Sequence, residues 1–176
     1  MMRWIIISEE YLSYLRSAEE RIPQSDYGKN HIKPFFGVLF ETEDCYYVTQ
    51  VSSAKERHNK MKQNLDFYKL YDKRSNKLLA VVNLNYMFPV PKSETVDLEY
   101  ARIQNYRDFE SDRQRSQYIH FLKIELCLIN KLKLDEAAKK LYALKYEYPD
   151  NVVSKRCLDY RALEELARKY HSQDLS

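Results

Sequence analysis

The chain has 176 residues, of which 44% are hydrophobic and 31% are charged, and its formal net charge at neutral pH is +3. A chain of this length most often forms one domain, so we expect a single domain over residues 1–176 with one hydrophobic core. Glycine occurs only at Gly28 and Gly37, which excludes the glycine-rich phosphate loops of the Walker and Rossmann types. The small positive charge permits a basic patch but does not by itself indicate nucleic-acid binding.

The cysteines give no sign of a disulfide framework or a metal site. Cys45, Cys127 and Cys157 are odd in number and widely spaced, and no Cys/His spacing typical of zinc is present. We therefore expect a reducing cytoplasm, no metal and no cofactor. The apolar run near the N-terminus is too short for a signal peptide or a membrane span, which predicts a soluble protein without a membrane partner. Cys127 lies in an apolar helical stretch and is expected in the core.

The first element predicted is a strand over residues 3–7, where a run of β-branched residues begins the chain. Ser8 follows as a helix N-cap, with two acidic residues in the first turn. The helix that it starts is expected to run for about three turns and to be ended by Pro23.

Strands dominate the rest of the first half. The stretches 35–41 (FFGVLFE) and 46–51 (YYVTQV) have strand composition, and the polar segment between them predicts a hairpin. Residues 67–71 and 78–83 repeat this pattern around the turn DKRSN. The prolines of residues 87–91 (MFPVP) confine that extended run to a sheet edge or a strand end.

The second half is rich in helix formers. Residues 107–133 carry apolar side chains at steps of three and four, residues 134–148 continue the pattern, and Asp159 is expected to cap a last helix. Strands come first and helices later, which predicts an α+β fold with an antiparallel sheet wrapped by helices.

Several catalytic chemistries lack the residues that they need. Glu41, Glu43 and Asp44 cluster at the tip of a predicted hairpin, where acids are normally solvated, so a two-metal nuclease site is not favoured. A Ser–His–Asp hydrolase would need a GxSxG elbow, and the required glycines are missing.

The stretch VSSAKERHNK, residues 51–60, fits metal-free phosphate chemistry. RNA carries its own nucleophile, the 2′-OH, so a protein that cleaves it must move protons and neutralise a pentavalent phosphorane. Lys55 and its basic neighbours suit the second task, while Ser52 and Ser53 can bind phosphate oxygens. A solvated charged loop is the commoner explanation of such a stretch.

A second basic loop precedes the first hairpin strand. SDYGKNHIKP, residues 25–34, contains Tyr27, Lys29, His31 and Lys33. If 35–41 and 46–51 pair, the residues before the first strand and those after the second lie at the same end of the hairpin. Lys33 is then expected to face the serines and lysine of VSSAKERHNK, although two ordinary sheet-end loops would give the same pattern.

Six blocks occur in the order RWIIISEEYLSYL (3–15), RIPQSDY (21–27), KPFFGVLFE (33–41), VSSAKERHNK (51–60), LLAVVNLNYMFPVP (78–91) and CLDYRALEELARKY (157–170). In this order and spacing they resemble the ToxN/AbiQ family, the endoribonuclease toxins of type III toxin–antitoxin and phage abortive-infection systems. The resemblance covers nearly the whole chain, and it rests on the order of the blocks more than on any one of them.

The resemblance implies a strongly twisted antiparallel sheet, distantly like the barrel of MazF-type toxins, wrapped by helices. It implies metal-independent, sequence-selective cleavage of cellular and phage RNA, with 2′,3′-cyclic phosphate and 5′-OH ends. It also implies an inhibitor, a small repeat-encoded pseudoknot RNA that the toxin cuts from its precursor and with which it closes into a ring.

Residue by residue, the resemblance assigns the catalytic role to Tyr27, Lys33, Ser52, Ser53, Lys55 and His58. We expect Lys33 and Lys55 to neutralise the scissile phosphate and the two serines to hold its oxygens or the 2′-OH. Tyr27 and His58 would stack on a base or move a proton, and His58 could equally be structural. The flanking phosphates are assigned to Lys29, His31, Arg57, Lys60 and Lys62.

Two alternatives remain open at the level of sequence. One is an RNA-binding module that uses the same basic loops without catalysis. The other is a small interaction protein whose helical half binds a partner.

Overall fold

The computed structural model describes residues 1–28 and 30–173, with side chains up to residue 170. Its strands are β1 (Arg3–Ile7), β2 (Phe35–Gly37), β3 (Cys45–Val48), β4 (Val51–Ser53), β5 (Phe67–Tyr71), β6 (Leu78–Asn83), β7 (Phe88–Pro91) and β8 (Thr95–Asp97). Its α-helices are α1 (Glu9–Ala18), α2 (Glu56–Lys60), α3 (Asp112–Ile129), α4 (Leu134–Glu147), α5 (Val152–Arg156) and α6 (Tyr160–Gln173). Three short 3-10 helices, η1 (Leu84–Tyr86), η2 (Lys92–Glu94) and η3 (Tyr100–Asn105), lie between β6 and α3.

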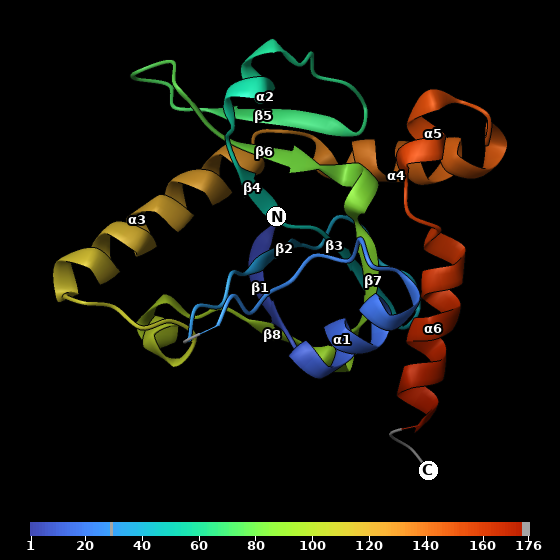
Figure 1. Ribbon diagram of the computed structural model, residues 1–176, viewed down its shortest axis with the longest axis horizontal. Helices are drawn as coiled ribbons and strands as arrows, with labels where there is room; N and C mark the ends of the chain where they lie inside the picture. The colour runs from blue at the N-terminus through green and yellow to red at the C-terminus, as the bar shows by residue number, and fades with distance from the viewer. Residues whose placement is uncertain (29, 174–176) are drawn as a thin grey trace.

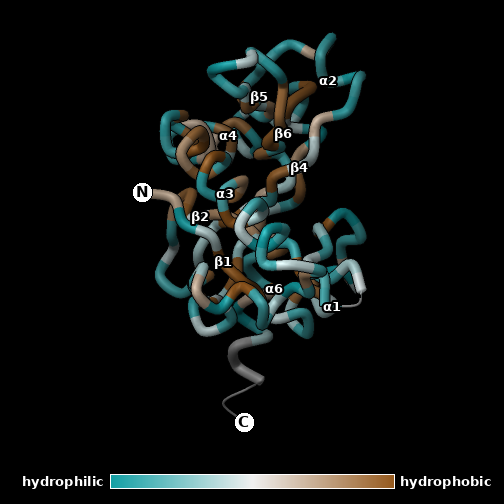
Figure 2. Tube along the Cα trace, turned by 90° about the vertical axis from the view of Figure 1, so that its left-hand side faces the viewer, coloured by the Kyte–Doolittle hydropathy of each residue, from teal (hydrophilic) through white to brown (hydrophobic). Residues whose placement is uncertain are grey.

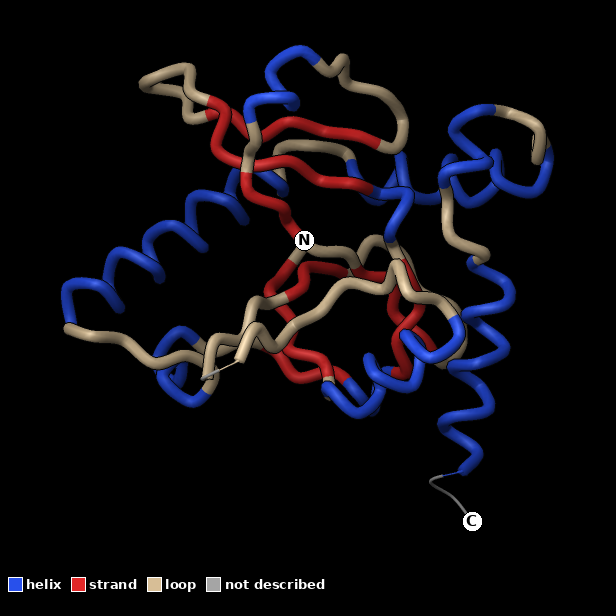
Figure 3. Tube along the Cα trace, viewed as in Figure 1, coloured by secondary structure: helices blue, strands red, loops and turns tan. Residues whose placement is uncertain are grey.

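The strands form three small antiparallel sheets with the orders β2-β1-β8, β3-β7 and β4-β6-β5. Figure 3 shows the strands in the middle of the molecule and the helices around them, with α3 on one side and α4, α5 and α6 on the other. The predicted α+β class with antiparallel pairing is confirmed. Over the described residues the sheets stay separate and close no barrel, so the MazF-like barrel is not shown.

The predicted hairpin forms, but its second strand is broken. Phe36 and Thr49 exchange two backbone hydrogen bonds of 2.8 and 3.1 Å, and the Leu39 N–H donates to the Tyr47 carbonyl at 2.9 Å. After Thr49 the chain leaves this pairing. As a result β3 pairs with β7, whereas β4 pairs with β6. One predicted strand therefore serves two sheets.

The helix boundaries largely follow the predicted caps. Ser8 Oγ accepts the Tyr11 N–H at 3.3 Å, and Asp159 Oδ1 accepts the Ala162 N–H at 3.2 Å. The prediction that Pro23 ends the first helix is wrong, because α1 already ends at Ala18. None of the helices in the described part of the chain is long and apolar enough to cross a membrane.

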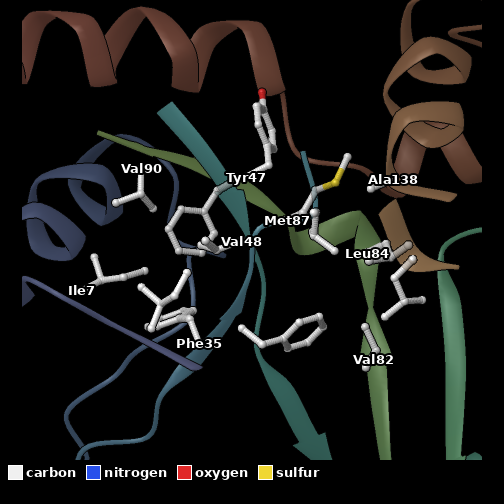
Figure 4. Close-up of a cluster of buried hydrophobic side chains, with 14 of the residues drawn as sticks. Ile7, Phe35, Tyr47, Val48, Val82, Leu84, Met87, Val90 and Ala138 are labelled. Atoms are coloured by element: carbon white, nitrogen blue, oxygen red, sulfur yellow. The ribbon is translucent and has the colours of Figure 1, made fainter. Parts of the chain in front are cut away.

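The core joins all three sheets to the C-terminal helices. Figure 4 shows side chains from β1, β2, β3 and β7 meeting next to Leu84 and Ala138, and Figure 2 shows the hydrophobic segments concentrated inside. A Cβ on Gly37 would lie 3.0 Å from Val48 Cγ1 and 3.2 Å from the Tyr47 carbonyl oxygen, so this close approach favours glycine. The prediction that Cys127 is a core residue is wrong: it lies on the exposed side of α3.

Candidate active site

A pocket of about 400 Å³ lies where loop 25–34, β1, β4 and α3 meet. Four of the residues singled out from the sequence line it, namely Tyr27, His31, Lys33 and Ser53. The first three come from the loop before the hairpin and Ser53 from the strand after it. Hairpin topology therefore brings Lys33 and Ser53 into one pocket, whereas Ser52 and Lys55, which were also expected to face Lys33, are not part of its lining.

The loop that carries Lys33 is held by its own backbone and by α1. The Lys33 N–H donates to the Ser25 carbonyl at 2.8 Å, and the Tyr27 N–H donates to the His31 carbonyl at 3.3 Å. Ser25 Oγ in turn donates to Glu9 Oε2 at 2.7 Å. These bonds give the loop a defined shape next to the sheet.

Gln50 ties this loop to the strand that carries Ser53. Its side chain is buried, and its Nε2 donates to the Gln24 carbonyl at 2.9 Å and to the Lys33 carbonyl at 3.3 Å. A buried amide with both hydrogens bonded fixes the geometry of its partners. The position of Lys33 relative to Ser53 therefore depends on Gln50.

The two adjacent serines face opposite sides of β4. Val51 and Ser53 line the pocket, and Ser52 lies between them on the other face, as strand alternation requires. The structure thus places Ser53 in the pocket and Ser52 outside its lining.

His58 supports the loop that carries Lys55. His58 is 5% exposed, and its Nδ1 accepts the Lys55 backbone N–H at 3.0 Å, while the His58 N–H donates to the Lys55 carbonyl at 2.9 Å. His58 Nε2 lies 3.5 Å from Arg57 Nε. Burial, together with the cations Arg57, Lys55 and Lys69, lowers the pKa of His58 and favours the neutral ring. Lys55 itself is exposed and does not line the pocket.

The other predicted RNA contacts lie outside the pocket lining or outside the described residues. Arg57, Lys60 and Lys62 are exposed in and just after α2, beyond β4 (Figure 1). Lys29 lies outside the described residues.

Burial and charge shift the titration of several groups in the pocket. Burial lowers the pKa of Lys33, while the nearby Glu125 carboxyl acts in the opposite direction. Burial also raises the pKa of Glu125 to about 7, with Lys33 as the opposing influence. The pKa of His31 is lowered by burial and by Arg107. The pocket therefore holds groups that can gain or lose protons near neutral pH.

The pocket also contains residues that the sequence did not reveal. Arg107, Tyr118, Phe121 and Glu125 line it, and the Arg107 guanidinium lies 4.3 Å from the centroid of the Tyr118 ring. A signal for Glu125 existed, because it lies three residues after Leu122 on the apolar face of the predicted helix. Across the described residues, no group of three or more His, Cys, Asp or Glu is arranged to hold a metal ion.

A lysine, a hydroxyl and aromatic rings in one pocket are the groups that bind a phosphate ester next to a base. By fold the protein is thus an α+β protein, and its pocket brings such groups together. The family model of the toxin ToxN of type III toxin–antitoxin systems matches residues 3–168. The chain belongs to this family.

Two relatives are named endoribonuclease ToxN. The one from Pectobacterium atrosepticum is 28% identical over 107 residues, which cover 59% of this chain and 63% of the relative. The one from Bacillus thuringiensis subsp. kurstaki is 25% identical over 169 residues, which cover 96% of this chain and 84% of the relative.

Solved structures show the same fold over almost the whole chain. The lactococcal anti-phage endoribonuclease AbiQ gives a TM-score of 0.76 at 20% identity and covers 98% of this chain and 99% of its own. A type III toxin that is selectively inhibited by a non-coding RNA pseudoknot gives a TM-score of 0.71 at 22% identity. The match covers 97% of this chain and 98% of that toxin.

Proposed function

We propose that this protein is an endoribonuclease toxin that cleaves RNA by attack of the 2′-OH, without a metal ion, and leaves 2′,3′-cyclic phosphate and 5′-OH ends. The observation that carries the proposal is that Lys33, from the loop before the hairpin, and Ser53, from strand β4 after it, line one pocket. A cation and a hydroxyl at one point supply the charge and the hydrogen bonds that a phosphorane needs. The family of the chain supports the same reaction.

Lys33 and Lys55 would neutralise the scissile phosphate, with Lys33 inside the pocket and Lys55 outside its lining, at the N-cap of α2. Ser53 would hold a phosphate oxygen. Ser52 would reach the RNA only from the other face of β4, which gives it the smaller role. Exposed Tyr27 at the pocket rim would stack on a base.

Other polar and cationic groups would bind the backbone on either side of the cut. His31, whose lowered pKa favours the neutral ring, would donate a hydrogen bond from the pocket lining, and Arg57, Lys60 and Lys62 present charge to solvent near Lys55. Such contacts act through charge and are independent of base sequence. Lys29 belongs to the same proposal on sequence grounds alone.

We also propose an RNA antitoxin as partner. One structural relative is a toxin inhibited by a non-coding RNA pseudoknot, and another belongs to an antiviral system regulated by a processed non-coding RNA. By analogy this chain, acting as one domain in the cytoplasm, would process a small pseudoknot RNA, close into a ring with it, and cleave cellular and phage RNA when released.

The test combines growth and chemistry. Lys55→Ala and Ser53→Ala should relieve the growth arrest caused by expression of the protein, and the purified variants should lose cleavage of total RNA in EDTA. Lys140→Ala, an exposed lysine on α4, removes the same charge far from the pocket and should keep full activity. Thermal melting of each variant checks the fold.

The products decide between the proposal and its alternative. Cyclic-phosphate ends from the wild type in EDTA support the enzyme. RNA binding without any cleavage would favour a binding module instead, and full toxicity of both folded variants would refute the residue assignments.

A further inference from the structure

Glu125 is a buried acid in the proposed active site that no structural interaction explains. It is 5% exposed and lies on α3 between the buried residues Leu122 and Ile129, so it faces the interior. It lines the same pocket as Lys33 and Ser53. Burying a carboxyl group is unfavourable unless it is paired, so an acid kept at this place needs a reason.

The Glu125 carboxyl group opens to the pocket. Within the described residues it forms no hydrogen bond and no ion pair, and its electrostatic partner is Lys33. Among those residues, no side-chain oxygen sealed from solvent lacks a hydrogen-bond partner, so the oxygens of Glu125 must reach the solvent of the cavity. A ligand in the pocket can therefore donate a hydrogen bond to them.

We propose that Glu125 is the general base that takes the proton from the attacking 2′-OH. The inference rests on the proposed function. The 2′-oxygen gives its proton to a Glu125 carboxylate oxygen and forms a bond to phosphorus, and the bond from phosphorus to the 5′-oxygen breaks. The leaving 5′-oxygen takes a proton from the Lys33 ammonium. Glu125 then returns its proton to the Lys33 amine, so the pair ends the cycle as it began, with no net proton taken up.

The protonation equilibria of the pocket suit this task. A general base works best when its pKa lies near the working pH, and burial brings the pKa of Glu125 to about 7. The other titratable or charged groups around the pocket are Tyr27, His31 and Lys33 from the loop, Arg107 after η3, and Tyr118 on α3. His58 suits the role less, because its Nδ1 already accepts the Lys55 N–H.

The first test is the pH dependence of single-turnover cleavage. The wild-type rate should rise through neutral pH as Glu125 ionises. Glu125→Gln, which keeps the shape and removes the base, should be slower by about 100-fold or more and should lose this rise. If folded Glu125→Gln cleaved RNA at the wild-type rate and with the wild-type pH profile, the inference would be overturned and the proposed function would stand. Absence of cleavage by the wild type would refute the proposed function itself.

The second test separates the base from the acid. An RNA with a bridging 5′-phosphorothiolate has a leaving group that needs no proton. This substrate should restore much of the rate of Lys33→Ala, which lacks the acid, and should not restore Glu125→Gln, which lacks the base. Restoration of Glu125→Gln would reverse the assignment and refute the role of Glu125 as base.

A second, independent feature is a basic groove next to the pocket. A cavity of about 690 Å³ lies between α3 and the turn that joins β5 to β6, and its cations are Lys73, Arg74, Lys123 and Lys131. Its one acid, Asp72, accepts hydrogen bonds from Ser75 and from the backbone of the same turn.

The groove and the candidate active site adjoin at one shared side chain. Phe121 lines both cavities and is 40% exposed. Lys73, Arg74 and Lys131 form no ion pair with any described residue, so their charge is available to a ligand. We infer that this groove binds the single-stranded RNA that leaves the active site, with its phosphates on the cations and a base on the Phe121 ring. This inference also rests on the proposed function.

Cys127 offers a direct probe, because it lines the groove and is exposed, whereas Cys45 and Cys157 are 4% and 2% exposed. A 2′-O-methyl RNA of about twelve nucleotides, which has no free nucleophile, should slow alkylation of Cys127 by iodoacetamide several-fold. The two buried cysteines report any unfolding. An alkylation rate of Cys127 that saturating RNA does not change would refute RNA binding in the groove. Cleavage by the wild type would show that the proposed function still holds.

Charge removal provides the matched comparison. Lys73→Ala combined with Arg74→Ala should reduce the slope of log affinity against log salt by about 1.4, since each phosphate contact to a single strand contributes about 0.7. Lys139→Ala combined with Lys140→Ala removes two exposed lysines on α4 and should leave the slope unchanged. Equal slopes in both double variants would refute the groove.

Discussion

Replacing Glu125 by glutamine should make the protein more stable at pH 8 and leave its stability at pH 4 almost unchanged. Burial raises the pKa of Glu125 from an ordinary value of 4.5 to about 7 in the folded protein. Since one pH unit of pKa difference corresponds to about 1.4 kcal/mol, ionising Glu125 costs the folded state about 3 kcal/mol. The carboxyl group of Glu125 has a higher pKa in the folded protein than in the unfolded chain. Its contribution to the free energy of unfolding is therefore complete below the unfolded pKa and is lost as pH rises through the folded pKa. Glutamine removes this loss.

The assay is urea unfolding followed by circular dichroism between pH 4 and pH 8. The pKa values of His31 and His58 are lowered in the folded protein, so both residues reduce the free energy of unfolding as pH falls. This effect is present in the wild type and in the variant alike. The difference between wild type and Glu125→Gln therefore reports Glu125 together with its effect on the neighbouring Lys33. It should grow with pH from near zero towards about 3 kcal/mol. Glu147→Gln, at the exposed end of α4, should show no such growth. A flat or falling difference would refute the burial of this carboxyl group.

Three further changes have defined outcomes. Arg156→Ala should lower the free energy of unfolding by about 3 kcal/mol, because it leaves the buried Asp66 carboxylate without its two 2.9 Å bonds; denaturant melts would show this. His58→Ala should speed hydrogen exchange at the Lys55 amide, since its acceptor is lost, and exchange mass spectrometry would detect it. Tyr47→Phe should cost about 1–2 kcal/mol in thermal melts, because a buried 2.6 Å bond to a carboxylate on α6 disappears. An unchanged melt or exchange rate would contradict the corresponding contact.

Local signals predicted the parts of the fold that local physics decides. Ser8 and Asp159 cap their helices because their side chains bond the free N–H groups of the first turn, wherever the helix packs. The hairpin that joins Lys33 to Ser53 was also predictable, since its strands are close in the chain. The split of the second strand was not. Thr49 Oγ1 donates to the Asn83 carbonyl, and that partner strand lies far along the sequence.

Glu125 and Cys127 show why half of the site was missed. Both lie on α3, and the apolar pattern of the sequence showed a helix without showing what would cover each face. The covering elements are loop 25–34 and β1, which are remote in sequence. As a result the acid became a pocket residue and the thiol stayed exposed. Such choices depend on tertiary packing rather than on helix periodicity.

The two hydrogen bonds of Gln50 have a genetic consequence. Toxicity, if it depends on Lys33 beside Ser53, also depends on a side chain that takes no part in the chemistry. A selection for cells that survive expression of the protein should therefore return substitutions at Gln50 alongside those in the pocket. Such survivors would make a folded protein in which loop 25–34 is no longer bonded to the segment that carries Ser53. The substituted positions would identify the residues that hold the active site in place, without any assay of RNA.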